Sequence, residues 1–347
     1  MIKIRALRPG ELRQVLTLLN RYSDRESEYS LLQKMQQLYI PLHRLSQLLP
    51  LTLQFMPAIF VAVADNKVLG MIWLSRDGRH SRRWKIDHLI LDPDSSSYDV
   101  GTQLIHYVTN RYGGDGVQTF LAYVDQHYST GLGLLKSCGF RRCARQHYFV
   151  HRNPANLKLS PMSLEGLREG TNADCGKLAA LYNDMLPVEA RVCLEKKWQD
   201  FYRPLPFRLL EKMRGVFSKR WVVQDMARDC LIASVEVLTH DYKAFTISVI
   251  ASPGWESAYQ DMVTYAAQQV LLTTSGATIY VDCYEFSKKG LESLERFGFQ
   301  RLGIAEVLVK DYWIPIEEKG SPLQSPILLF SGRTTPATNC DAGLELI

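Results

Sequence analysis

Apolar residues recur along the chain with two spacings, one of three to four positions and one of two positions or fewer. The first spacing is typical of amphipathic helices and the second of strands. After a short initial strand, the first half shows a helix at 11–22, a β-rich hairpin at 60–75, a strand at 84–91, a helix at 101–112, a strand at 120–125, a helix at 130–137 and a strand at 140–150. This order predicts an α/β (α+β) fold, in which a mixed, mostly antiparallel sheet carries helices on both faces.

The second half repeats the elements of the first half in the same order. Residues 278–309 align with residues 119–150 at a shift of 159 positions and are identical at eight of the 32 positions, Gly139/Gly298 and Phe140/Phe299 among them. Eight identities are few, but a helical segment and a hairpin precede them in both halves. The pattern therefore predicts a duplicated fold.

The predicted boundary between the two copies lies in a stretch of the chain rich in Pro, Asn and Ser, at 151–163. Such a composition is typical of a connecting loop. The last stretch mixes Gly, Ser, Pro and Thr and is predicted to be a loose tail. The predicted divisions are a first domain at 1–155, a second at 164–318 and the tail at 319–347.

Composition narrows the class of protein. The 347 residues are 46% hydrophobic and 22% charged, which fits two globular domains, and the net charge of +5 is too small to indicate nucleic-acid binding. No apolar run is long enough to span a bilayer, and the N-terminal residues lack the apolar core of a secretory signal. The seven cysteines show no CxxC spacing, which favours reduced thiols, a cytoplasmic location and no metal site.

Two segments of the first half carry a motif that has a chemical meaning. In 89–105, Gly101 follows Pro93 by eight residues, and Leu104 and Ile105 form an apolar pair in the helix after it. The segment 124–140 ends in Gly139 and Phe140. In spacing and endings, both segments resemble the GNAT-type N-acetyltransferases, which use acetyl-CoA, and the resemblance extends more faintly over 221–310.

The resemblance implies a tandem GNAT protein whose first lobe binds acetyl-CoA and transfers its acetyl group to an unidentified amine, on a small molecule or a protein. A loop that opens a helix presents unpaired N–H groups to a pyrophosphate. The cofactor contacts implied in this way are Leu89, Leu91, Ser96, Ser97, Tyr98, Asp99, Val100, Gly101 and Thr102.

Two residues are implied to be catalytic. Asp87 occupies the position of a family carboxylate that accepts a proton through a water molecule. Tyr128 stands where the family has an Asn that contacts the cofactor, and it could replace the missing family Tyr as the acid that protonates the leaving thiolate. Strand alternation predicts that His88 lies on the face opposite Asp87. In the alternative interpretation all three residues have structural roles. Asp87 is then a solvent-facing charge, Tyr128 a packed ring and His88 a core histidine.

The sequence departs from the family pattern where the chemistry is expected. Ser96 and Asp99 replace the usual Gln or Arg and the first glycine, and Leu135 replaces the usual Tyr. In the second half, Glu256, Tyr259 and Asp261 occupy the three key loop positions. The second lobe is therefore predicted to be a degenerate copy that binds no CoA and shapes the acceptor site.

Two insertions leave a second hypothesis open. Residues 42–57 are unusually apolar, and residues 203–221 place basic side chains such as Arg203 and Arg220 among Phe, Leu, Met and Trp. These segments either pack the two lobes together or bind a protein partner or a membrane surface. In the second case the chain is a non-catalytic GNAT-fold module, so the sequence leaves open whether the protein is an enzyme.

Overall fold

The computed structural model describes residues 2–21, 58–78, 82–93, 96–154, 165–213, 215–274 and 276–312. The apolar insertion at 42–57, the tail at 319–347 and residues 155–163 of the predicted boundary between the domains lie outside the described residues. No helix in the described part of the chain combines the length and the apolar character needed to cross a bilayer.

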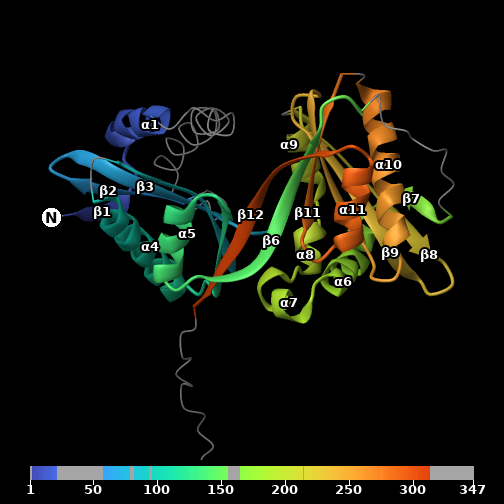
Figure 1. Ribbon diagram of the computed structural model, residues 1–347, viewed down its shortest axis with the longest axis horizontal. Coiled ribbons are helices and arrows are strands. Elements are labelled where there is room, and N and C mark those ends of the chain that lie inside the picture. Colours follow the sequence, from blue (N-terminus) through green and yellow to red (C-terminus); the bar gives the residue numbers. More distant parts are fainter. Residues whose placement is uncertain are drawn as a thin grey trace, which may run out of the picture. The chain divides into compact units, whose positions relative to one another are not determined.

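The first half follows the predicted order of elements (Figure 1). Its turn at Asp65 and Asn66 has φ angles of 50° and 60°, the left-handed geometry that tight hairpins require. The elements are β1 (Lys3–Ala6), η1 (Pro9–Glu11), α1 (Leu12–Arg21), β2 (Ala58–Ala64), β3 (Lys67–Arg76), β4 (Arg83–Leu91), α4 (Ser97–Gly114), β5 (Thr119–Asp125), α5 (Ser129–Ser137) and β6 (Arg141–His151).

The second half has the same succession, with additional helices in its long insertion. Residues 186–219, predicted only as a variable insertion, contain three short helices. The elements are β7 (Leu167–Glu169), η4 (Asn172–Asp174), α6 (Cys175–Met185), α7 (Val188–Leu194), α8 (Trp198–Phe201), α9 (Leu205–Met213), β8 (Phe217–Asp225), β9 (Cys230–Thr239), β10 (Ala244–Ala251), α10 (Glu256–Thr273), β11 (Thr278–Tyr284), α11 (Lys288–Arg296) and β12 (Gln300–Asp311).

The strands of both halves form one sheet of 12 strands in the order β1-β2-β3-β4-β5-β12-β6-β11-β10-β9-β8-β7. The last strand of each half is exchanged: β12 pairs with β5 of the first half, and β6 pairs with β11 of the second half. β6 and β12 also pair with each other, and they run side by side in Figure 1. The two copies therefore share a continuous hydrogen-bonded core, which the local sequence pattern does not reveal.

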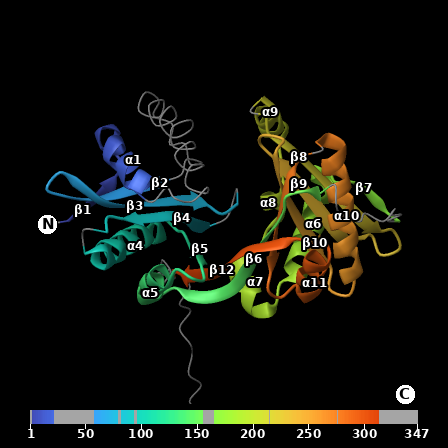
Figure 2. The same cartoon turned by 45° about the horizontal axis from the view of Figure 1, so that its top comes forward.

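Helices cover both faces of the sheet, as predicted, because successive strand residues point to opposite sides. In β2, Phe60 packs in the cluster that contains residues of α4 and α5, whereas Val61 packs in the cluster that contains residues of α1. Figure 2 shows α1 and α4 on opposite sides of β1–β4. The second half has the same arrangement, with α10 and α11 on one face and α6 to α8 on the other.

An equivalent ion pair occurs at the start of each half. In the first half, Arg5 Nη2 lies 2.5 Å from Glu11 Oε1. In the second half, Arg168 donates to Asp174 at 2.9 and 2.6 Å. In both halves the carboxylate also accepts a hydrogen bond from a backbone N–H three residues earlier, at Arg8 and at Thr171. The same device thus holds the edge strand to the first helix twice.

A buried arginine connects the two halves outside the sheet. Arg83 of β4 donates through Nη1 to the carbonyl oxygens of Cys193 and Glu195, each at 2.8 Å, and through Nε to Asp77 Oδ2 at 2.5 Å. The two carbonyls lie at the C-terminal end of α7, where backbone acceptors lack partners within the helix. A guanidinium there satisfies both oxygens and complements the helix dipole.

Candidate functional site

The backbone of the first half opens between β4 and β5. Their parallel pairing runs from Arg83↔Thr119 to Ile86↔Ala122, although both strands continue beyond that pair. The backbone groups of β4 after Ile86 that face β5 are consequently not used in that ladder. Such groups need another partner, and an extended ligand between the strands would supply one.

Asp87 occupies a β-bulge at the start of this opening. The pairing of β3 with β4 shifts between Trp73↔His88 and Leu74↔Ile86, so Asp87 is the extra residue. Its carboxylate is partly buried and lies 3.5 Å from Lys85 Nζ. A bulge is a common device for aiming a functional side chain, and here it coincides with the predicted base.

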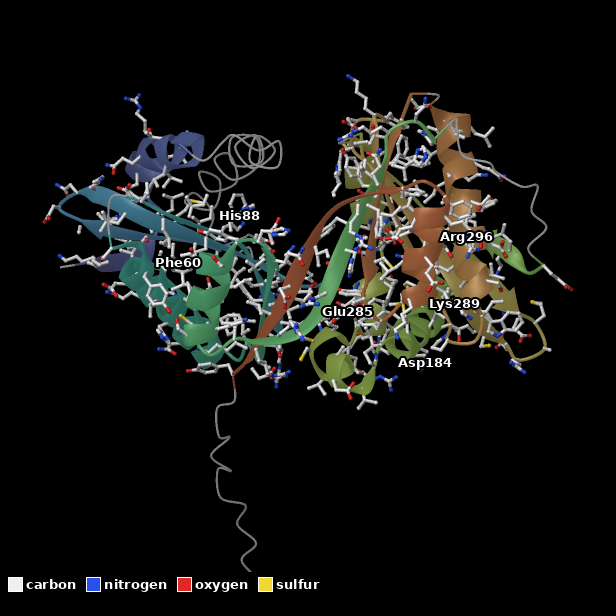
Figure 3. All side chains as sticks on the ribbon, in the orientation of Figure 1. Phe60, His88, Asp184, Glu285, Lys289 and Arg296 are labelled. Carbon is white, nitrogen blue, oxygen red and sulfur yellow. The ribbon has the colours of Figure 1, made fainter. Side chains whose placement is uncertain are left out.

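Because of the bulge, the His88 side chain does not lie on the face of the strand that alternation predicts. Alternation predicts opposite faces for Asp87 and His88, but alternation does not continue through an inserted residue. The His88 ring packs edge-on against Trp73 at 5.8 Å, within the cluster on the α1 face, and Asp87 pairs with Lys85 on that same face. His88 is labelled in Figure 3. Both side chains therefore belong to one face of β4.

The N-terminal turn of α4 forms much of the segment predicted to hold the cofactor. The helix begins at Ser97 rather than Gly101, with Ser96 as its N-cap and no side-chain cap hydrogen bond. The first hydrogen bond of the helix runs from Val100 N to Ser96 O at 3.1 Å. The N–H groups before Val100 therefore have no acceptor within the helix. These donors suit an anion, whereas the exposed Asp99 carboxylate opposes one.

The predicted contact residues divide into exposed and buried groups. Ser96, Tyr98 and Asp99 are exposed, while Leu89, Leu91, Ser97 and Thr102 are half-buried. Val100 and Gly101 are buried in the core. A Cβ atom on Gly101 would lie 2.6 Å from Leu134 Cδ2 and 2.9 Å from Leu91 Cδ1, so this glycine allows α4 to pack closely against α5 and β4.

Tyr128 lies at the N-cap of α5 and is 58% exposed. Its ring covers the first turn of this helix, because a Cβ on Gly131 would lie 2.4 Å from it. The backbone places it after β5, since Tyr128 N donates to Asp125 O at 3.0 Å. The predicted acid thus follows the strand that borders the opening, with its phenol accessible to solvent.

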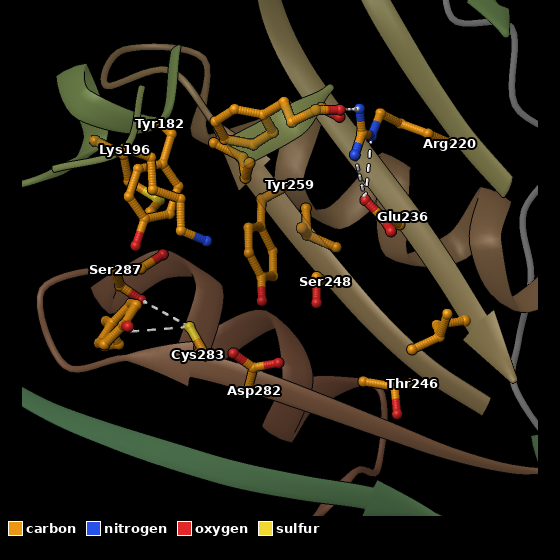
Figure 4. Close-up of a pocket in the computed structure, with 17 residues that line it drawn as sticks. Tyr182, Lys196, Arg220, Glu236, Thr246, Ser248, Tyr259, Asp282, Cys283 and Ser287 are labelled. Atoms are coloured by element: carbon orange, nitrogen blue, oxygen red, sulfur yellow. Dashed lines mark hydrogen bonds and ion pairs between the residues drawn. The ribbon is translucent and has the colours of Figure 1, made fainter. Parts of the chain in front are cut away.

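A second opening, which the sequence analysis did not predict, lies in the second half. The parallel pairing of β10 with β11 ends at Ile247↔Val281, and a cavity of about 250 Å³ lies where the strands part. Figure 4 shows the residues that line it. Its polar lining consists of Tyr182, Lys196, Arg220, Ser234, Glu236, Thr246, Ser248, Tyr259, Asp282, Cys283, Tyr284 and Ser287.

Two carboxylates line this cavity in different electrostatic surroundings. Glu236 accepts hydrogen bonds from Arg203 and Arg220. Burial alone would raise the pKa of Glu236, but the two guanidinium groups outweigh burial and lower it. Asp282 accepts from Gln146 Nε2 at 2.5 Å, and burial raises the pKa of Asp282. Gln146 belongs to β6, so the exchanged strand of the first half completes the wall.

Cys283 and Tyr259, which line the same cavity beside Asp282, are neutral side chains. Burial raises the pKa of the Cys283 thiol to about 11, so this cysteine is not a thiolate near neutral pH. The phenol of Tyr259 is 4% exposed, and its Oη is buried without a hydrogen-bond partner among the described residues. The arrangement is therefore suited to binding a polar ligand rather than to nucleophilic attack by cysteine.

One signal in the sequence marked this second site. The shift of 159 positions aligns Asp282 with Tyr123, which places a carboxylate inside a strand between Val281 and Cys283. Glu236 likewise interrupts an apolar strand. Buried carboxylates within strands are uncommon unless they have partners. Their partners could not be identified before the fold was known, because Arg203, Lys196 and Gln146 lie far away in sequence.

The fold and the two openings define the class of protein, and comparison with known proteins agrees. A tandem GNAT protein from the clavulanic acid biosynthesis pathway superposes with a TM-score of 0.57 at 12% identity, covering 90% of this chain and 99% of that one. A GCN5-related N-acetyltransferase from Sphaerobacter thermophilus gives 0.59 at 12% identity, covering 90% and 96%. This chain therefore has a tandem GNAT fold.

The sequence comparison gives one family match, and it lies in the first half. Residues 22–140 match the sequence model of the acetyltransferase (GNAT) family. No curated protein matches the chain. A glucosamine N-acetyltransferase region of a fungal multi-domain GH3 β-N-acetylglucosaminidase also superposes, with a TM-score of 0.59 at 12% identity over 89% of this chain and 38% of that one. The GNAT family uses acetyl-CoA as its acetyl donor.

Proposed function

We propose that the first lobe transfers the acetyl group of acetyl-CoA to the amine of a small molecule or protein. The observation that carries this proposal is the opening between β4 and β5, which begins beside the bulged carboxylate of Asp87. The GNAT domain match lies in the same lobe. A site for acyl transfer to an amine needs an extended donor held on backbone groups, an accessible base and stabilisation of an oxyanion, and this opening supplies a location for each.

The donor is held by backbone groups in this proposal. The N–H groups at the start of α4, with the hydroxyls of Ser96 and Ser97 beside them, bind the pyrophosphate. The Thr102 hydroxyl is buried next to Cys138 and takes no part. Leu89 and Leu91 line the opening, and a main-chain N–H near Leu91 polarises the thioester carbonyl. Asp99 turns its carboxylate to solvent. The buried Val100 and Gly101 act by bringing the helix close to the strand.

Chemistry then proceeds by direct attack. The amine nitrogen attacks the thioester carbonyl carbon and forms a tetrahedral intermediate, while Asp87 accepts the proton of the amine through a water molecule. Collapse of the intermediate breaks the C–S bond. Tyr128 gives its proton to the departing thiolate, for which a phenol is a suitable acid because its ordinary pKa is near 10.

The proposal is tested by binding and by turnover. Calorimetric titration with acetyl-CoA is expected to show one site per chain at micromolar affinity. Release of CoA thiol, followed with amino sugars, polyamines, amino acids and short peptides as acceptors, is expected to fall by about 10²-fold or more in Asp87→Asn, because general-base catalysis is lost. Asp115→Asn, an exposed aspartate beyond α4, is the matched control and should behave like wild type. Absence of binding at millimolar acetyl-CoA would exclude the enzyme reading.

A second candidate function is a non-catalytic module that binds a protein partner or membrane surface, and α9 favours it. Leu205, Leu209 and Met213 recur every four residues along this helix and are 75%, 62% and 78% exposed. Arg203 and Arg220 of the same basic segment instead point inward to Glu236. If α9 binds membranes, wild-type protein should sediment with anionic phospholipid vesicles and Leu209→Glu should not. If equal amounts of the two proteins sediment with the vesicles, α9 does not bind membranes.

A further inference from the structure

The cavity of the second half contains four charged side chains, and two of them neutralise each other. Arg220 Nη2 lies 2.7 Å from Glu236 Oε2, and Arg203 pairs with the other oxygen. Arg220 Nη1 additionally donates to Phe201 O at 3.2 Å. These groups therefore hold the wall together, and a ligand would gain little by competing for them.

The other two charged groups are Lys196 and Asp282. Neither has an ion-pair partner among the residues that the structure describes. Lys196 Nζ instead lies 4.4 Å from the centre of the Tyr182 ring. Its backbone is held by Asn183, through Lys196 N to Asn183 Oδ1 at 2.9 Å and Asn183 Nδ2 to Lys196 O at 2.8 Å. The Lys196 side chain lines the cavity, and its charge acts on both Glu236 and Asp282 without a direct ion pair to either of them. An ammonium group placed in this way can receive an anion from a ligand.

Asp282 is fixed as firmly on β11. Gln146 Nε2 donates to its Oδ2 at 2.5 Å, and Gln146 is itself positioned by the Tyr148 phenol, which donates to Gln146 Oε1 at 3.3 Å. The second carboxylate oxygen of Asp282 remains available to the cavity. Figure 4 shows Asp282 on one wall and Lys196 on another, with the cavity between them.

Uncharged polar groups line the space between these two charges. The buried Oη of Tyr259 lacks a partner among the described residues and points into the cavity, next to the thiol of Cys283 and the hydroxyl of Ser248. The thiol of Cys283 is a weak partner for this phenol, and a ligand or water that accepts the phenol proton would give it a stronger hydrogen bond. The ring of Tyr259 also lines this cavity, whose volume of about 250 Å³ suits a small ligand.

We propose that this cavity is a binding site for a free amino acid, held as a zwitterion. Its carboxylate lies against Lys196 and accepts from the Tyr259 phenol, and its ammonium group donates to Asp282. Both charges of the ligand then meet the two charges of the cavity that have no partner of their own, so neither end is buried uncompensated. The site is in the second lobe and does not depend on acetyl transfer in the first.

Blocked ligands test the proposal on the unmodified protein. The twenty common L-amino acids are titrated one at a time at up to 5 mM, with binding followed by calorimetry and by the shift in thermal unfolding. At least one is expected to bind. Its N-acetyl derivative and its carboxamide should each bind about tenfold more weakly or worse, because each removes one of the two charges. If no amino acid binds, or if acetate or an alkylamine alone binds as well, the proposal is wrong.

Variants then assign the two ends of the ligand. Lys196→Met is expected to weaken the amino acid by about tenfold or more while leaving the affinity of its carboxamide unchanged, and Asp282→Asn is expected to do the converse with the N-acetyl derivative. Lys197→Met, at the exposed neighbouring lysine, is the control and should bind like wild type. Unchanged binding in both cavity variants would place the ligand elsewhere. Acetyl-CoA binding, measured in parallel, reports separately on the first lobe.

Discussion

The two halves open their sheets at the same place but line the openings with different side chains. In both halves, four residue pairs join the fourth and fifth strands before the pairing stops. Directly after the last joined pair, the first half has the aromatic residues Trp73 in β3 and Tyr123 in β5. The second half has the carboxylates Glu236 in β9 and Asp282 in β11 at the equivalent positions. The duplicated backbone pairing therefore fixes where a ligand could enter, and the side chains fix what it could be.

The openings also differ in strand pairing, because the fourth strand of the first half has one residue more than its partner at this point. The first half carries Asp87 as an extra residue opposite β3, and the second half pairs without interruption at Glu236↔Ser248. An inserted residue leaves a side chain outside the ladder and free to act on a ligand. The second half places its carboxylates within regular strands, where neighbouring residues can hold them. This difference agrees with a catalytic role for the first opening and a binding role for the second.

The largest expected effect is a loss of stability when Arg83 is removed, since this side chain links the two halves and has no counterpart in the second half. Arg83 of the first half occupies the register position that Ala244 occupies in the second. Arg83→Ala should lower the free energy of unfolding by about 3–5 kcal/mol, because it leaves Asp77 and the carbonyl oxygens of Cys193 and Glu195, the first of them buried, without their donor. Urea unfolding measures the loss. The exposed Arg82→Ala is the control, and similar small losses in both variants would contradict the assigned role of Arg83.

The duplicated ion pair gives the next effect. Hydrogen bonds from Arg168 and Thr171 lower the pKa of Asp174 to about 2, although burial opposes them. A carboxylate whose folded pKa lies below its unfolded value stabilises the fold fully above the unfolded value near 4, and this contribution disappears as the pH falls towards 2. Asp174→Asn should therefore cost about 2 kcal/mol at pH 7 and progressively less below pH 4.

The matching change in the first half sharpens that test. Glu11→Gln removes the equivalent contact to Arg5, whose partner carboxylate is more exposed, at 12% of its side chain against 5% for Asp174. The expected loss is about 1 kcal/mol, since more exposed pairs contribute less. Thermal unfolding from pH 2 to 7 compares the two variants. A loss for Asp174→Asn that does not change with pH would mean that packing, and not charge, stabilises this turn.

A third effect separates the packing role of Gly101 from ligand binding. Gly101→Ala should cost about 1–3 kcal/mol, because the new methyl group would overlap Leu134 and Leu91. Gly114→Ala, near the end of the same helix and with no atom near its added Cβ, should be neutral or stabilising by up to about 1 kcal/mol. If Gly101→Ala weakens acetyl-CoA binding while stability is unchanged, its role lies in the ligand site instead.

Residues close in sequence made the order of elements predictable, whereas contacts between distant residues could not be predicted. The alternation in 60–75 and the Asp65-Asn66 turn sufficed for the first hairpin. Alternation shows that a strand forms but does not show its partner, so the exchange of β6 and β12 was not foreseen. For the same reason, Asp87 could be proposed from a local motif. The second cavity depends on Lys196 and Asp282, which only the fold brings together.

The smallest expected effect is a difference in thiol reactivity, which distinguishes a binding cavity from a nucleophilic one. Cys283 lies in the second opening at the position that Val124 has in the first, and burial raises its pKa to about 11. At pH 8 about one molecule in a thousand would carry the thiolate that iodoacetamide attacks. The exposed Cys230 should therefore be alkylated well before Cys283, as peptide mass spectrometry over time can show. In urea the two should react alike, which controls for the peptide itself. Fast native alkylation of Cys283 would instead mean that the cavity activates its thiol, and the second opening would then have to be considered a reaction centre like the first.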